Sequence, residues 1–265
     1  MAAVPASWQE YLAGPAGIAD AAWQREVFAR AAAAVSGIRA VQLGLPEINA
    51  LERSAIAFRI LAVPGIAILA EDDLRLQVLA DESALPLESG CADLVAWPHG
   101  PGRAADMTAA LAEIERVLAP NGVVMLSFFN ASGAWNLKRK LLPSRSPVPA
   151  GSRPQGTAAV VRALKNAGLA PEGGVFGVYG TGAKEKAGTG WVEKAGDRWW
   201  PTFSNLVLLT ARKKSAGMTL VGRASFAPAE ASGRAAAAGS LPRVAAERSA
   251  AAGEIAITAG ERNTP

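Results

Sequence analysis

The sequence predicts a doubly wound α/β domain built on a mostly parallel β-sheet. The clearest support lies in residues 74–130, where two short apolar runs precede a segment of helical periodicity and a third apolar run. Strands that alternate with a helix of this length are typical of βαβ units. Apolar residues make up 50% of the 265-residue chain, which is enough for a sizeable core.

Two helices are expected before the sheet begins. Residues 7–12 form a short helical turn that ends at Gly14 and Pro15. Residues 18–35 carry apolar side chains at helical spacing, and Gly37 follows as a stop signal. We expect the apolar face of this second helix to lie against the sheet.

Seven apolar runs are predicted to be strands, at residues 38–44, 55–63, 75–80, 93–97, 123–129, 175–179 and 203–211. Apolar periodicity predicts helices at residues 105–118 and 157–169, and Pro46 favours a short helix over residues 48–54. Residues 66–70 fit either a strand or a loop. Residues 119–122, Ala-Pro-Asn-Gly, are a strong stop and turn signal before the strand that follows.

Three segments are predicted to be irregular. Residues 138–156 are basic and proline-rich, which indicates a surface segment or lid. Residues 180–190 form a glycine-rich, flexible connection. Residues 222–265 consist mostly of Ala, Gly, Ser, Pro and scattered charges, and such a tail buries too little apolar surface to become ordered. The folded domain is therefore expected to span residues 1–221.

Composition narrows the cellular context. The single cysteine, Cys91, excludes an internal disulfide and fits a protein of the reducing cytoplasm. The first residues lack the basic and apolar regions of a secretory signal, and the apolar stretch at residues 55–70 is too interrupted to span a membrane. The net charge of +4 is mild, and no basic patch is interleaved with aromatic residues, so composition does not favour a nucleic-acid partner.

Most catalytic and metal motifs are missing from the sequence. His99 is its only histidine, which excludes a metal site with several histidines and a two-histidine mechanism. No Gly-x-Ser-x-Gly elbow accompanies it. The glycine-rich residues 180–184 lack the adjacent Gly-Lys pair of a phosphate loop. We therefore predict no metal site.

Several polar or permissive residues follow the predicted strands directly. Gly44, Asp81, Pro98 and His99 each come just after a strand, and ligands of open α/β sheets bind outside the carboxyl ends of the strands. Asp81 can accept hydrogen bonds from a ribose or an exocyclic amine, or it can cap a loop or helix. His99 can assist deprotonation of a substrate, or it can shape its loop through hydrogen bonds.

Residues 80–100 and 110–130 together resemble the central part of SAM-dependent methyltransferases of the type 11 branch. The likeness rests on an acidic residue, a Leu-Pro-hydrophobic loop, Asp-Leu-Val, and a helix that ends Glu-x-x-Arg-Val-Leu-x-Pro-x-Gly. In this chain these are Asp81, Leu85-Pro86-Leu87, Asp93-Leu94-Val95, residues 113–118, Pro120 and Gly122. The segment that follows Phe203 also suits that fold.

The resemblance implies a Rossmann-like sheet of seven strands with one antiparallel strand near its C-terminal edge, and S-adenosylmethionine (SAM) as cofactor. It places Asp81 at the adenine amino group, with Glu82, Ala84 and Leu85 beside the ring. It places Trp97, Pro98 and His99 at the methionine end and the acceptor, with His99 as the candidate catalytic residue. Gly44 is the remaining cofactor-binding position that the resemblance assigns.

The sequence departs from this family in the loop after the first strand. The family has several glycines there, which let the backbone approach the cofactor, whereas this chain keeps only Gly44 and continues with Leu45 and Pro46. The second strand ends without the acid that holds the ribose, for which Glu47 or residues 71–73 are substitutes. Two hypotheses follow: a methyltransferase that acts on a small-molecule or unidentified acceptor, and an inactive methyltransferase-like module that binds a partner through residues 138–153.

Limited proteolysis tests the predicted domain boundary. We expect a protease of broad specificity to trim the chain to near Val221 and to leave a compact core, because a disordered tail is cleaved first. Mass spectrometry of the stable fragment measures the end point. Protection of residues 222–265 would contradict the prediction.

Overall fold

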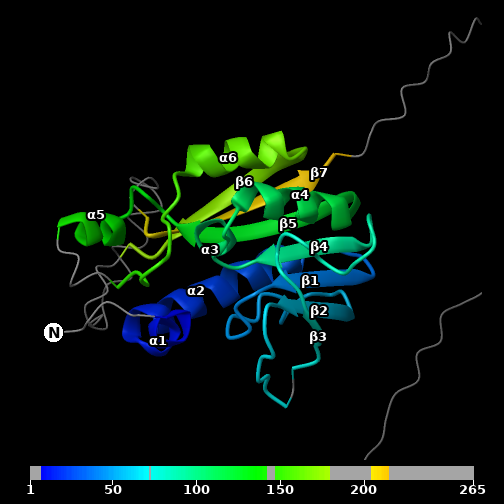
Figure 1. Cartoon of the computed structure of the whole chain (residues 1–265), viewed down its shortest axis with the longest axis horizontal. Helices are drawn as coiled ribbons and strands as arrows, with labels where there is room; N and C mark the ends of the chain where they lie inside the picture. The colour runs from blue at the N-terminus through cyan, green and yellow to red at the C-terminus, as the bar shows by residue number, and fades with distance from the viewer. Residues whose placement is uncertain (1–6, 72, 142–146, 180–203, 215–265) are drawn as a thin grey trace, which may run out of the picture. The chain divides into compact units, whose positions relative to one another are not determined.

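A computed structural model of the chain describes residues 7–71, 73–141, 147–179 and 204–214. The strands, shown in Figure 1, are β1 (Arg39–Leu43), β2 (Phe58–Val63), β3 (Leu76–Leu79), β4 (Ala92–Trp97), β5 (Leu118–Phe129), β6 (Leu169–Gly177) and β7 (Leu206–Lys213). The helices are α1 (Trp8–Ala13), α2 (Pro15–Ala32), α3 (Gly100–Arg103), α4 (Met107–Val117), α5 (Ala134–Leu141) and α6 (Thr157–Asn166).

The seven strands of the described residues form one sheet in the order β3-β2-β1-β4-β5-β7-β6. From β3 to β5 all neighbouring strands are parallel. β7 is antiparallel to both of its neighbours, β5 and β6. The predicted fold, a mostly parallel seven-stranded sheet with one antiparallel strand near its C-terminal edge, is therefore confirmed.

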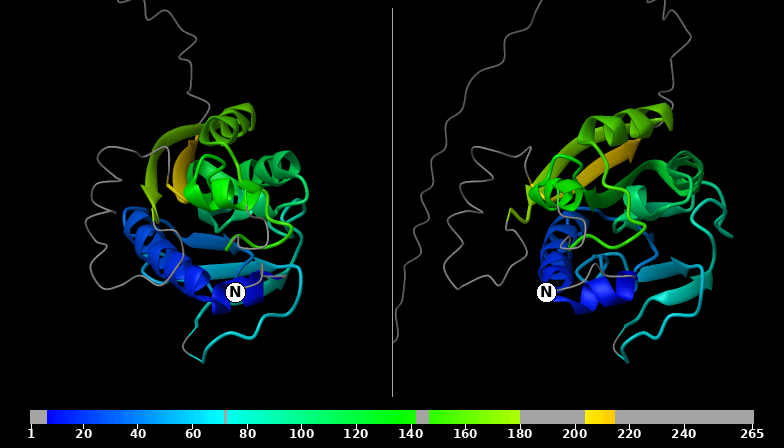
Figure 2. Two further views of the ribbon diagram at one scale, coloured as in Figure 1. Left: turned by 90° about the vertical axis from the view of Figure 1, so that its left-hand side faces the viewer. Right: turned by 60° about the vertical axis from the view of Figure 1, so that its left-hand side comes forward.

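Helices cover both faces of the sheet, as Figure 2 shows. Successive side chains of a strand point to opposite faces. Val95 of β4 packs in a buried cluster with Ile114 of α4 and Leu164 of α6. Leu94, its neighbour in sequence, packs on the other face in a cluster with Phe28 of α2. The sheet is thus buried on both sides, which explains the nearly continuous apolar runs of its central strands.

The predicted short helix at residues 48–54 is wrong, because these residues form turns. Their apolar side chains are nevertheless fully buried: Ile48, Ala50 and Leu51 have no exposed surface. Ala50 and Leu51 belong to the same cluster as Phe28. Tertiary packing, rather than helical periodicity, therefore places this segment.

The predicted turn at residues 119–122 lies inside a strand. β5 begins at Leu118, and the pairing register between β4 and β5 shifts between Ala92 and Leu94. Asn121 takes up the irregularity with a positive φ of 64°. Asparagine is among the residues that tolerate this conformation, so the turn signal produces a bulge instead of a break.

The predicted irregular segments have mixed outcomes. Residues 66–70 form a loop, and Lys138, Arg139 and Lys140 lie in α5 instead of an irregular lid. The prediction holds better for residues 147–156, which contain no helix and only an isolated bridge to Asn130. The connection at residues 180–190 and the tail at residues 222–265 lie outside the described residues.

Within the described ranges, no helix combines the length and the apolar character that crossing a membrane requires.

Candidate functional site

Two cavities open at the carboxyl ends of the parallel strands, beside the point where the strand order reverses between β1 and β4. The larger has a volume of about 460 Å³ and is lined by residues after β1 and β2, together with Trp8 and Gln9 of α1. The smaller has a volume of about 300 Å³ and is lined by residues after β3 and by the link between α3 and α4. Ligand sites of open α/β sheets lie at this position.

The buried side chain of Gln42 organises the loop after β1. Its Nε2 donates to three carbonyls of the loop, those of Gly44 (3.2 Å), Leu45 (3.0 Å) and Ile48 (2.7 Å). Its Oε1 accepts from Ala50 N at 3.0 Å and from Arg75 Nη1 at 2.8 Å. These bonds hold Gly44 and Leu45 at positive φ values of 64° and 40°, a conformation that is unfavourable for leucine.

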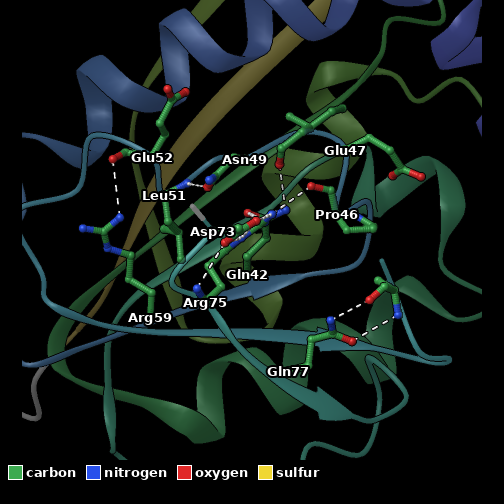
Figure 3. Close-up of polar contacts among 12 residues, drawn as sticks. Gln42, Pro46, Glu47, Asn49, Leu51, Glu52, Arg59, Asp73, Arg75 and Gln77 are labelled. Atoms are coloured by element: carbon green, nitrogen blue, oxygen red, sulfur yellow. Dashed lines mark hydrogen bonds and ion pairs between the residues drawn. The ribbon is translucent and has the colours of Figure 1, made fainter. Parts of the chain in front are cut away.

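Arg75 ties the connection before β3 to the same loop, as Figure 3 shows. Its Nη2 donates to Pro46 O at 2.9 Å, and its guanidinium forms a buried ion pair with Asp73. Hydrogen bonding to Arg75 lowers the pKa of Asp73. Asp73 is therefore committed to Arg75 and lines neither cavity. Among the predicted substitutes for the ribose acid that the structure describes, Glu47 is the one that lines the larger cavity.

Asp81 lies in the smaller cavity at the start of the turn after β3. Its Oδ1 accepts from the backbone N of Ser83 at 2.9 Å and from Ser83 Oγ at 2.5 Å. These two bonds lower the pKa of Asp81, with a further contribution from the charge of Arg103. The loop-capping role is thus present in the structure. Since one carboxylate oxygen makes these bonds, the other leaves room for the predicted ligand contact.

The Leu-Pro-Leu loop is attached to α4 by the Glu-x-x-Arg pair of the family pattern. Glu113 Oε1 accepts from Leu85 N at 2.7 Å. Arg116 Nη2 donates to Leu85 O at 3.1 Å and to Leu87 O at 2.9 Å, and the two charged side chains also pair with each other. This pair therefore fixes the path of the chain just after the residues that line the smaller cavity.

Several predicted cofactor contacts lie beside the cavities rather than in their walls. Leu85 and Trp97 are buried in the core cluster on the α4 face, and Pro98 is buried as well. Ala84 is exposed in the turn after β3. None of these four lines either cavity. Their contact with a cofactor stays a prediction, whereas Gly44, Asp81 and Glu82 do line the crevice.

His99 is buried beneath the crevice, with 1% of its surface exposed. Its Nε2 lies 2.7 Å from Asp20 Oδ2 and 2.6 Å from Gln24 Nε2, both on α2. Its backbone N donates to Ser127 Oγ at 2.9 Å, and this hydroxyl donates to Gln24 Oε1 at 2.6 Å. The geometry favours the alternative in which His99 shapes its loop, and the catalytic role stays a prediction.

The same network docks the N-terminal helices onto the sheet. Tyr11 of α1 donates its hydroxyl to Asp20 Oδ2 at 2.7 Å. The His99 ring packs against two aromatic rings, with centroids 4.4 Å from Phe129 and 4.8 Å from Trp8, and these two rings also stack on each other. Because Trp8 also lines the larger cavity, this buried network positions one wall of the crevice.

Arg103 lines both cavities, and Pro64 is the one other described residue that they share. Its guanidinium lies over Gly44, where an added Cβ would overlap it, and it forms an ion pair with Glu82. Arg103 is not among the site residues predicted from the sequence. One signal in the sequence could have indicated it: Arg103 ends a Gly-Pro-Gly-Arg segment shortly after a predicted strand. Residues at such a position lie at the edge of the sheet where ligands bind.

No known protein-family profile and no curated protein sequence matches the chain. Solved structures do match it. A Haloferax volcanii protein assigned as a methyltransferase, in complex with a methyltransferase activator, has a TM-score of 0.57 at 16% identity, over 76% of this chain and 93% of that one. A SAM-dependent methyltransferase of Thermotoga maritima has a TM-score of 0.53 at 16% identity, over 74% of this chain and 96% of that one.

The cyclase SpnF also matches, with a TM-score of 0.51 at 16% identity, over 75% of this chain and 82% of its own. At such identities a structural likeness establishes the fold. The chain therefore has the Rossmann-like fold of the SAM-dependent methyltransferases, as the resemblance of residues 80–130 predicts. Since a cyclase shares this fold, the reaction has to be argued from the site.

Replacement of Gln42 tests its role in the first loop. Gln42→Leu leaves several buried backbone groups unpaired, so we expect the free energy of unfolding to fall by about 3 kcal/mol. Gln77→Leu is the matched control, since Gln77 is exposed and its side chain bonds, among the described residues, only to the backbone of Ala67. Gln77→Leu should lower the free energy of unfolding by less than about 1 kcal/mol. Urea denaturation measures both, and equal losses would contradict the role of Gln42.

Tyr11 makes folding sensitive to alkaline pH. Burial and the nearby Asp20 raise the pKa of Tyr11 well above its ordinary value. Above pH ~10 the unfolded chain therefore releases a proton that the folded chain keeps, and stability falls by about 1.4 kcal/mol per pH unit from this group. Urea denaturation between pH 8 and 11 measures the free energy of unfolding. We expect it to fall less steeply with rising pH in Tyr11→Phe than in the wild type. Identical slopes would contradict this assignment.

Proposed function

We propose that this chain is a SAM-dependent methyltransferase whose acceptor is still to be identified. The observation that supports this most directly is the crevice at the strand-order reversal. The loop after β1 and the segment after β4 line the same cavity there, and Asp81 and Glu82 follow β3 beside it. In a sheet of this topology, that is where a nucleoside-containing ligand binds.

The cavity walls offer the contacts that such a ligand needs. Glu47 is available to accept from ribose hydroxyls, and Asp81 to accept from an adenine amine. Val63, Pro64 and Ile66 supply an apolar wall. SAM carries a methyl group on a sulfonium and so supplies an activated methyl for transfer. A mostly apolar pocket with a few polar groups at its edges matches this ligand.

In this proposal the protein contributes to catalysis by positioning its ligands. Placing an acceptor in line with an activated methyl group lowers the barrier without a strong base at the site. The burial of His99 agrees with this view, because its imidazole reaches the larger cavity only by packing against Trp8, which lines it. Residues of the crevice, rather than His99, then set the geometry of transfer.

The second candidate function is an inactive methyltransferase-like module. It is favoured by Leu45 and Pro46, which stand where glycines would let the backbone approach a cofactor. Isothermal titration of the full chain with SAM separates the two functions. Saturable heat supports the methyltransferase, and the absence of heat and of a thermal shift at millimolar SAM supports the module.

Asp81→Ala tests the proposed adenine contact. We expect the affinity for SAM to fall about 10-fold, the usual cost of a lost hydrogen bond to a charged acceptor. Ser83→Ala is the matched control, because it removes the hydroxyl that bonds to Asp81 and keeps the carboxylate. This variant should bind SAM as the wild type does. If Asp81→Ala binds with unchanged affinity, Asp81 does not contact the ligand.

A further inference from the structure

Arg103 places a positive charge in the middle of the crevice. Its side chain is 17% exposed, lines both cavities and lies directly over Gly44. Burial lowers the pKa of Arg103 to about 10, while the charges of Asp81 and Glu47 act in the opposite direction. The guanidinium therefore stays charged at neutral pH, and it requires an anionic partner there.

The present partner uses only part of the guanidinium. Glu82 Oε1 pairs with Nη2, whereas Nε is buried without a hydrogen-bond partner among the described residues. The Nε and Nη2 hydrogens of an arginine form a fork that matches the two oxygens of a carboxylate. The Nε–Nη2 edge of Arg103 can thus bind a carboxylate through two hydrogen bonds, but Glu82 makes only one of them.

We propose that Arg103 anchors the carboxylate of the ligand, and that this carboxylate replaces Glu82 on the guanidinium fork. This inference rests on the proposed function and makes it more specific. It defines the ligand class as one with an α-amino-acid end, as SAM has. The carboxylate binds Arg103, and the acids that line the cavities, Glu47 and Asp81, keep the ribose and adenine contacts of the proposed function.

The unusual first loop makes such an anchor necessary. Pro46 has no N–H group, and Leu45 closes the approach that glycine would allow. The amide of Gln42 also holds the loop carbonyls in place. Backbone donors of this loop are therefore poorly suited to hold a carboxylate. The side chain of Arg103 occupies the same space above Gly44 and supplies the donors instead.

The exchange requires little movement of the backbone. Arg103 ends the short helix α3, which Arg153 holds by donating its backbone N to Gly102 O at 2.9 Å. An added Cβ at Gly102 would lie 2.8 Å from Arg153 O, so this contact is close. Glu82 lies in the turn after β3, and its side chain is 13% exposed. In this proposal the Glu82 side chain rotates away to free the fork.

Titration with two ligands that differ only in the carboxylate tests the anchor. The ligands are SAM and decarboxylated SAM, and the full chain is titrated with each. We expect Arg103→Met to lower the affinity for SAM about 10- to 100-fold and the affinity for decarboxylated SAM less than about 3-fold. Glu82→Gln removes the competing carboxylate and should raise the affinity for SAM about 3-fold or more.

Arg103→Lys is the second variant, since it keeps the charge but not the fork, and it should also lose affinity selectively for SAM. Circular dichroism and thermal unfolding confirm that each variant is folded. If Arg103→Met and Arg103→Lys change the affinities for SAM and decarboxylated SAM by the same factor, Arg103 is not the anchor. The proposed function then stands without it. If the wild type binds neither ligand, the proposed function fails and the anchor with it.

Discussion

The amide of Gln42 is the interaction on which the candidate site depends. It is buried in the middle of the sheet and pairs both as donor and as acceptor with the loop that begins at Gly44. A buried amide of this kind is costly unless all its bonds are made, so the loop is held in one conformation. Leu45 keeps its positive φ for this reason, and Arg75 joins the network from the neighbouring connection. The larger cavity is the space that this loop leaves open.

This loop shifts recognition in the crevice from the backbone to side chains. Where glycines would bring the chain close to a ligand, this protein has Leu45 and Pro46 and fills the space above Gly44 with Arg103. A buried guanidinium discriminates strongly between ligands, because it stabilises a carboxylate and repels a cation. The fold alone does not determine the chemistry, since the cyclase SpnF shares it. The arrangement of Arg103 and its neighbouring acids is what points to a ligand with an amino-acid end.

The sheet could be predicted from the sequence because its strands are buried on both faces and read as apolar runs, as in residues 93–97 and 123–129. Asp81 and Gly44 could be predicted as crevice residues since both directly follow strands. The burial of His99 could not, because its partner Asp20 lies 79 positions away on α2 and no local pattern links them. The role of Arg103 was missed for a similar reason: its importance depends on Gly44, Glu82 and two cavities that only the folded chain brings together.

A crystal structure of the full chain with S-adenosylhomocysteine tests the central claim most directly. We expect the nucleoside between Glu47 and Asp81, the ligand carboxylate on the Arg103 fork, and Glu82 turned away from it. Ligand bound elsewhere, or an Arg103–Glu82 ion pair that persists at saturating ligand, would show that Arg103 does not anchor the ligand.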